Sequence, residues 1–286
     1  MKTRVVTAAV GLCLLAVVLA FFDTVLFDLV LALICLIGMH EVYSAMGFGR
    51  RQWYLYAVAV PYTMLIMLSS SAAVRALVLP ASFLVVLYYN ICLIARHQTL
   101  DFTKLAGFVY FSGVILFCFY SLVHLKRTLP TGTYGYDAVY FILLILCFAW
   151  GGDTCAYFAG RAFGKHKLCP VVSPKKTVEG AIGGVLGTMV FGVAATLIYS
   201  AAADRMEIFT QSNIGVSMFV VIALLGIVAA VLGIYGDLFA SVVKRQCGIK
   251  DYGIIFPGHG GILDRFDSVM FIAPFVTMVI TAVFYR

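Results

Sequence analysis

Long apolar runs, separated by short polar stretches, make up most of the chain. Each of nine runs is about 17–25 residues long, which is enough for a helix to cross the hydrocarbon core of a bilayer. The runs cover residues 5–22, 24–41, 53–70, 76–95, 104–125, 136–158, 178–200, 214–238 and 265–285. This pattern predicts an all-α, polytopic integral membrane protein with about nine transmembrane helices.

The composition supports this prediction. Hydrophobic residues make up 63% of the chain and charged residues 12%, whereas soluble domains carry roughly 25% charged residues. The apolar run that follows the N-terminal Met1 is long for a secretory signal, and no small-residue cleavage site stands out after it. We therefore expect the first helix to be retained.

The positive charges predict the orientation in the membrane. Cytoplasmic loops of membrane proteins are enriched in Lys and Arg. If the N-terminus is cytoplasmic, 15 of the 20 Lys and Arg residues fall on the cytoplasmic side. This predicts a cytoplasmic N-terminus and a C-terminus on the opposite side. The net charge of +7 then reflects topology and contact with lipid headgroups, and it gives no support for nucleic-acid binding.

The two halves of the chain differ in their polar residues. Residues 1–125 contain short loops and no chemical constellation, so we interpret them as N-terminal anchor and scaffold helices. Residues 126–286 contain two long loops, 159–177 and 239–264, which the charge pattern puts on the cytoplasmic side. Long loops often carry function, so this half is the predicted catalytic region.

Two features of the apolar runs are interpreted as structural. Glu41, at the end of the second run, is interpreted as an interfacial group. Gly180, Gly183, Gly184 and Gly187 recur at spacings of three and four residues in the seventh run. Such a face of small residues predicts close packing against a neighbouring helix.

The segment 241–267 is the densest polar run, with four cations and three carboxylates. Charges at a membrane edge are costly unless they are paired or coordinate a metal ion. Residues 257–261, Pro-Gly-His-Gly-Gly, cannot form regular helix and can bring backbone N–H groups close to an anion. Asp264 and Asp267 are three residues apart where the last run begins, so they would project from one helix face.

Carboxylates at this spacing repel each other unless a cation lies between them. Mg²⁺ binds through one or two carboxylates together with substrate phosphates. Asp237, at the end of the eighth run, can approach from the neighbouring helix, and Asp153 is a weaker fourth candidate because it lies inside an apolar run. In the alternative interpretation these acids only pair with Arg265, Lys244 and Arg245.

The string Ser173-Pro174-Lys175-Lys176-Thr177 is typical of a helix start. Ser173 can cap the helix, and Pro174 suits the first helical position. Free N–H groups and the two lysines would then form a phosphate site. Alternatively, the lysines only reflect the orientation in the membrane.

The polar segment has a fixed order of residues, namely Ser241, Lys244, Arg245, Lys250, Asp251, residues 257–261, Asp264, Arg265 and Asp267. This pattern resembles the signature of phosphatidate cytidylyltransferases, also called CDP-diacylglycerol synthases. The resemblance extends to residues 150–161 and 173–180. It implies a membrane nucleotidyltransferase of phospholipid biosynthesis, which converts CTP and phosphatidate to CDP-diacylglycerol and pyrophosphate.

The resemblance also implies roles for individual residues. It implies a Mg²⁺ site and leaves a second metal ion open, with the ligands Asp237, Asp264, Asp267 and Asp153. The catalytic group would comprise Asp264, Asp267, Asp237, Arg265, Lys244 and His259. The substrate phosphates would be bound by Ser173, Lys175, Lys176, Thr177, Arg245 and Lys250, and which of the two loops holds the nucleotide and which the lipid headgroup stays open. The chain departs from the family pattern at Val178, where Trp is common, and at Ala240, where Glu is frequent.

The expected partners are CTP, phosphatidate and membrane lipids, and the resemblance suggests a homodimer. We expect a bacterial inner membrane, with an organellar membrane as the open alternative, and the charge count puts the active site on the cytoplasmic face. Two alternative functions also stay open. A transporter would hold its acids near the membrane midplane, whereas here they cluster at helix ends beside cationic loops. A CTP-dependent polyprenol kinase is closer in chemistry, and only the full signature argues against it.

Overall fold

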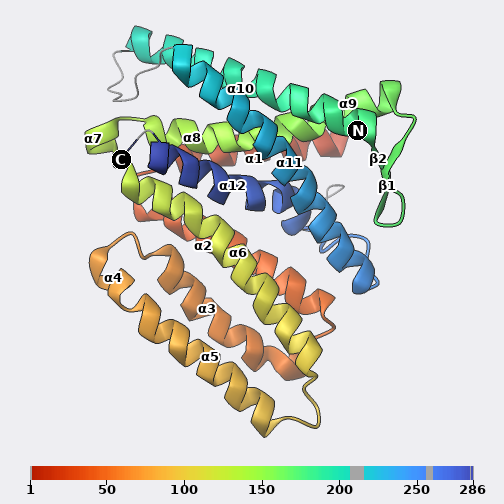
Figure 1. Cartoon of the computed structure of the whole chain (residues 1–286). Coiled ribbons are helices and arrows are strands. Elements are labelled where there is room, and N and C mark those ends of the chain that lie inside the picture. Colours follow the sequence, from red (N-terminus) through yellow and green to blue (C-terminus); the bar gives the residue numbers. More distant parts are fainter. Residues whose placement is uncertain (1, 207–215, 256–259, 284, 286) are drawn as a thin grey trace. The chain divides into compact units, whose positions relative to one another are not determined.

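The structure is a computed structural model that describes residues 2–206, 216–255, 260–283 and 285 (Figure 1). Its N-terminal elements are α1 (Lys2–Ala20), α2 (Val25–Ala45), the short helix η1 (Arg50–Gln52), α3 (Trp53–Met67), α4 (Ala72–Ala76), α5 (Val78–Ala95) and α6 (Phe102–Thr128). The elements that follow are α7 (Thr131–Tyr134), α8 (Asp137–Leu146), the π-helical turn η2 (Cys147–Gly151), α9 (Gly152–Phe163), β1 (Lys167–Cys169), β2 (Ser173–Thr177), α10 (Val178–Met206), α11 (Val216–Gln246) and α12 (Leu263–Val283).

The helices confirm the all-α, polytopic class. Seven helices in the described part of the chain are long and apolar enough to cross a membrane, and α8, η2 and α9 count together as one of them. Each of the nine predicted runs overlaps a helix. Two of the nine runs correspond to helices that fall short of a span by length. In α1 the apolar part counted is Ala9–Ala20, and α3 has 15 residues. The number of nine spans and the cytoplasmic N-terminus stay predictions.

The chain forms two compact units. Unit 1 consists of Met1–His124 and Gln246–Arg265, and unit 2 consists of Leu125–Arg245 and Phe266–Arg286. Most of the polar signature after α11 therefore packs with the N-terminal helices. The assignment of residues 1–125 as anchor and 126–286 as catalytic region stays a prediction.

In unit 1, α2 packs against α3, and α3 packs against α5 (Figure 1, red to orange). Tyrosine hydroxyls connect these helices, since Tyr56 donates to the carbonyl of Leu36 at 2.8 Å and Tyr89 donates to the carbonyl of Leu55 at 3.0 Å. Each hydroxyl gains a partner in an otherwise apolar setting. These hydrogen bonds thus join α2, α3 and α5 into one packed group.

In unit 2, the predicted glycine face is confirmed. A Cβ atom added at Gly183 would collide with Ala159 of α9, and one added at Gly187 would collide with Cys155. At Gly180 such an atom would lie 2.9 Å from a backbone carbonyl oxygen of α9. The backbones of α9 and α10 therefore approach as closely as small residues allow.

Two predicted boundaries are wrong. The prediction of a helix start at Ser173 fails because residues 173–177 form strand β2, which pairs antiparallel with β1. The helix begins at Val178, and Thr177 caps it by accepting a hydrogen bond from the amide of Gly180 at 3.1 Å. The predicted loop 239–264 starts too early, because α11 continues to Gln246. Gly248 follows two residues later with a φ of 71°, which favours glycine.

Candidate active site

Three carboxylates of unit 2 lie near one another although they come from three helices. Asp267 on α12 is buried, and its carboxylate interacts electrostatically with Asp237 on α11, with Asp153 on α9 and with the cation Lys244. Gly236 makes this approach possible, since a Cβ atom there would collide with the backbone carbonyl of Asp267. The sequence prediction that Asp237 approaches Asp267 from a neighbouring helix is confirmed.

Cations and hydroxyls line the same carboxylates. The ammonium of Lys176 lies 2.6 Å from Oδ2 of Asp237. The hydroxyl of Ser241 donates to Oδ1 of the same aspartate at 3.2 Å, and Ser268 donates to Oδ2 of Asp153, also at 3.2 Å. The site therefore combines negative and positive side chains, as binding of a metal ion and phosphates requires.

The hairpin of β1 and β2 presents Lys176 to Asp237. Glu179, in the first turn of α10, closes the base of this hairpin, because its carboxylate accepts from the amide of Lys165 at 3.0 Å and contacts Nδ1 of His166 at 2.6 Å. Lys175, the neighbour of Lys176, is exposed. The predicted phosphate site formed by both lysines stays a prediction.

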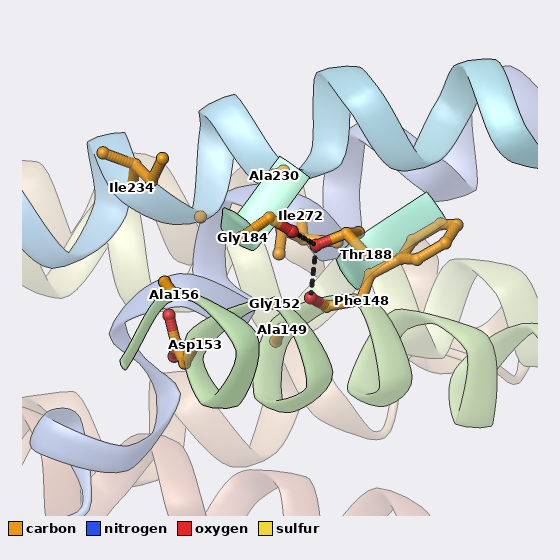
Figure 2. Close-up of a pocket in the computed structure, with 11 residues that line it drawn as sticks. Phe148, Ala149, Gly152, Asp153, Ala156, Gly184, Thr188, Ala230, Ile234 and Ile272 are labelled. Atoms are coloured by element: carbon orange, nitrogen blue, oxygen red, sulfur yellow. Dashed lines mark hydrogen bonds between the residues drawn. The ribbon is translucent and has the colours of Figure 1, made fainter. Parts of the chain in front are cut away.

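Asp153 lies directly after the π-helical turn η2, where α8 continues into α9. It lines a cavity of about 20 Å³ together with Gly152, Gly184, Thr188 and seven other residues (Figure 2). A cavity of this size can hold one water molecule. The hydroxyl of Thr188 donates to the carbonyl of Gly184 at 2.8 Å (Figure 2). π-Helical turns are frequent at functional sites, and here the turn adjoins the acid.

The carboxylates fit a divalent cation. No group of three or more His, Cys, Asp or Glu side chains in the described ranges is arranged as a complete metal site. Mg²⁺ nevertheless needs only one or two carboxylates, since substrate phosphates and waters complete its shell. Like charges that face one another, as Asp267 and Asp237 do, are stabilised by a cation between them. Magnesium binding itself stays a prediction.

Asp264, predicted as a partner of Asp267, has different surroundings in unit 1. The helix α12 begins at Leu263, so both acids lie in its first turns as predicted. Oδ2 of Asp264 accepts from the backbone amide of Tyr252 at 2.8 Å and from that of Gly261 at 3.0 Å. This aspartate therefore holds the preceding segment in place, and its role as a metal ligand stays a prediction.

Glu41 is the acid that sequence reasoning misinterpreted. It is not an interfacial group, because its side chain is 4% exposed and binds the backbone of residues 262 and 263. The signal was present in the sequence, since an acid inside an apolar run is a functional candidate by default. Of the amides in the glycine-rich stretch 257–261, that of Gly261 donates to Asp264, whereas residues 257–259 lie outside the described residues.

The remaining predicted site residues have varied positions. Lys244 is buried on α11, Ser173 is half-buried on β2, and the side chains of four cations are exposed, namely Lys175, Arg245, Lys250 and Arg265. Thr177 is buried and caps α10. His259 lies outside the described residues. The roles of these residues in binding phosphates stay predictions.

Comparison with known proteins decides the class. The sequence profile of the cytidylyltransferase family matches residues 2–283. The chain belongs to the cytidylyltransferase family. It is thus an enzyme, a nucleotidyltransferase, and the transporter alternative is wrong.

Relatives of this family member occur in staphylococci. It is similar to a phosphatidate cytidylyltransferase of Staphylococcus haemolyticus, with 32% identity over 292 residues, which is 98% of this chain and 99% of the relative. The proteins of the same name from Staphylococcus saprophyticus and Staphylococcus aureus are 41% and 40% identical over 144 residues, which is half of each chain. The likeness therefore extends over the whole chain and is strongest over half of it.

Proposed function

We propose that this enzyme transfers the cytidylyl group of CTP to phosphatidate, which yields CDP-diacylglycerol and pyrophosphate for phospholipid synthesis. A phosphate oxygen of phosphatidate forms a bond to the α-phosphorus of CTP. The bond from that phosphorus to the bridging oxygen of the β-phosphate breaks, and pyrophosphate leaves with the electron pair. A phosphatidate phosphate is already ionised at neutral pH, so the step requires no strong general base.

One observation carries this proposal. The ion pair between Lys176 and Asp237, at 2.6 Å, joins the segment 173–180, which belongs to the family resemblance, to α11, whose end begins the polar signature. Asp237 lies beside a second acid, Asp267. If a cation binds between these two carboxylates, the ammonium of Lys176 can leave Asp237 and bind a substrate phosphate instead. Catalysis then consists of positioning and of stabilising charge on the phosphates.

Individual side chains take the following parts. Lys176 and Lys244 bind and orient the phosphates of CTP, and the exposed Lys175, Arg245, Lys250 and Arg265 attract the two anionic substrates. Asp237 and Asp267 would hold Mg²⁺, with Asp153 nearby and Asp264 as a further candidate. When bound, Mg²⁺ would neutralise charge on the phosphate oxygens.

The reaction joins a water-borne nucleotide to a lipid held in the bilayer, so its site belongs at a membrane surface. We propose the cytoplasmic face of a bacterial inner membrane, because 15 of the 20 Lys and Arg residues fall on that side when the N-terminus is cytoplasmic. Assembly as a homodimer stays a prediction from the family resemblance.

The test is an assay of the purified protein in detergent with phosphatidate, Mg²⁺ and CTP labelled at either the α- or the γ-phosphorus. Cytidylyl transfer moves the α-label into the lipid and the γ-label into pyrophosphate. A CTP-dependent lipid kinase would instead move the γ-label into the lipid. Labelling of the lipid by γ-labelled CTP, or the absence of lipid labelling from both, contradicts the proposed function.

A further inference from the structure

The carboxylate of Glu41 binds the beginning of α12 across 221 positions of sequence. Its Oε1 accepts from the amide of Ile262 at 2.8 Å, and its Oε2 accepts from the amide of Leu263 at 2.9 Å. Glu41 lies on α2, within unit 1, and its side chain is buried. Both of its oxygens therefore face main-chain donors.

The start of α12 needs such a partner. The first amides of a helix have no acceptor within the helix, and a side chain just before the helix usually supplies one. Here the residues at that place are Ile262 and Leu263, whose side chains cannot accept a hydrogen bond. A carboxylate at a helix N-terminus is also favoured by the helix dipole. Glu41, on α2, supplies both the hydrogen-bond acceptor and the negative charge at the start of α12.

The glycines around this carboxylate are fitted to it. A Cβ atom at Gly253 would lie 2.5 Å from Oε1 of Glu41, and one at Gly261 would collide with the same carboxylate. On α2, one turn before Glu41, Gly38 makes room for the side chain of Leu263, since a Cβ atom there would lie 3.0 Å from it. Gly261, the last glycine of the Pro-Gly-His-Gly-Gly string, thus has to be a glycine because a larger residue would collide with Glu41.

Glu41 and Asp264 hold consecutive amides. The amide of Gly261 donates to Asp264, and the next two donate to Glu41. Gly260, with φ of 87°, turns the chain just before them. The orientation of Asp264 therefore depends on a backbone that Glu41 fixes. We propose that Glu41, which lies outside the signature, is a positioning residue for cytidylyl transfer, acting through residues 260–264; this inference rests on the proposed function.

A role in direct contact with substrate does not fit Glu41. Its side chain is 4% exposed, and a carboxylate that accepts main-chain hydrogen bonds on both oxygens is poorly suited to approach an anionic phosphate. Its effect on the reaction passes through the position of Asp264. Loss of Glu41 should consequently lower kcat and leave the binding of both substrates nearly unchanged.

The test compares Glu41→Gln with Asp28→Asn. Asp28 is a second buried carboxylate on α2, in its first turn, and serves as the matched control for loss of a buried charge. We expect Glu41→Gln to lower kcat by about 10- to 100-fold, since hydrogen bonds to a charged group are strong, while the KM values for CTP and phosphatidate change less than about twofold. Asp28→Asn should keep kcat within about twofold of the wild type.

Hydrogen exchange of peptides that cover residues 251–265 gives a readout without substrate. Glu41→Gln should accelerate exchange there and leave the peptides of α3 and α5 unchanged. If wild-type protein fails to form CDP-diacylglycerol, the proposed function fails, whereas the exchange data still decide whether Glu41 orders this segment. Unchanged kcat together with unchanged exchange in Glu41→Gln overturns the inference, and so does an equal loss in Asp28→Asn.

A second variant covers the case in which Glu41→Gln does not fold. Gly253→Ala keeps the charge and displaces the carboxylate, because its new methyl group would lie 2.5 Å from Oε1. It should reproduce the fall in kcat and the faster exchange of residues 251–265. Wild-type kcat and exchange in Gly253→Ala would contradict the inference.

Discussion

The candidate-site acids of the two units differ in their main partners. In unit 1, Glu41 and Asp264 accept hydrogen bonds from backbone amides of residues 252 and 261–263. In unit 2, Asp237 pairs with Lys176. Asp267 interacts with Asp237, Asp153 and Lys244, and it also accepts from the backbone amide of the next residue, Ser268, at 2.9 Å. Carboxylates bound by amides stabilise a backbone conformation, whereas carboxylates that face charged side chains can bind a cation or exchange partners with a substrate. The signature thus contains two acids three residues apart, Asp264 with backbone amides as its partners and Asp267 beside charged side chains.

The largest expected effect separates these two acids. Asp267→Asn should reduce turnover by at least about 100-fold, since losing one charged stabilising group in an active site commonly costs 10²–10³-fold, and its melting temperature should stay close to that of the wild type. Asp264→Asn should reduce turnover as well, but it should also lower the melting temperature, because the amides of Tyr252 and Gly261 lose an acceptor for which the charge matters.

The measurement is a Mg²⁺ titration of activity, recorded beside thermal unfolding for both variants. An Asp267→Asn protein with a near-normal rate and an unshifted Mg²⁺ midpoint would show that this aspartate holds no metal. Equal losses of stability in both variants would remove the distinction between the two acids.

A smaller effect is expected on the basic side of the unit 2 site. Lys176→Ala should raise the KM for CTP several-fold, because it removes a charged phosphate contact worth about 1.5–3 kcal/mol, and it should leave the KM for phosphatidate near the wild-type value. Lys175→Ala is the matched control, since its side chain is exposed on the same strand. A rise confined to phosphatidate would reassign the hairpin to the lipid headgroup, and equal effects of both variants would mean that only net charge matters.

The smallest effect concerns packing away from the acids of unit 2. Gly183→Ala should destabilise the protein by about 1–3 kcal/mol, as overpacking of a tight interface does, because its methyl group would collide with Ala159. Gly113→Ala, on α6, has no atom within 4 Å of the new methyl group and should be neutral or slightly stabilising. Melting temperatures of both variants decide this, and an unchanged value for Gly183→Ala would contradict the close approach of α9 and α10.

The sequence was sufficient for much of the fold because apolar length and small-residue spacing are local signals. The runs, the glycine face and the start of α12 could all be predicted in this way. The hairpin could not, since Ser173 and Pro174 carry a plausible helix-start pattern and the strand depends on pairing with β1. The end of α11 was also missed, because charged residues such as Lys244 and Arg245 continue a helix as readily as they begin a loop.

For the site, the sequence identified the charged residues of the signature but not their partners. The proximity of Asp237 and Asp267 followed from their helices meeting on one side of the membrane. The partners of Asp264 are backbone amides. Every residue except proline carries such a donor, so the residue types in the sequence do not indicate which amides will bind it. Glu41 was misinterpreted for the same reason, since its contacts lie more than 200 positions away in the sequence.

The long sequence separation of Glu41 from Ile262 has a consequence for biosynthesis. A ribosome that adds roughly 5–20 residues per second needs about ten to forty seconds to pass from α2 to α12, because the two residues are 221 positions apart. During that interval α2 is already made, while the amides that its acid will bind do not yet exist. The hydrogen bonds between Glu41 and the start of α12 can therefore form only after α12 has been synthesised, so the enzyme gains its full activity no earlier than that.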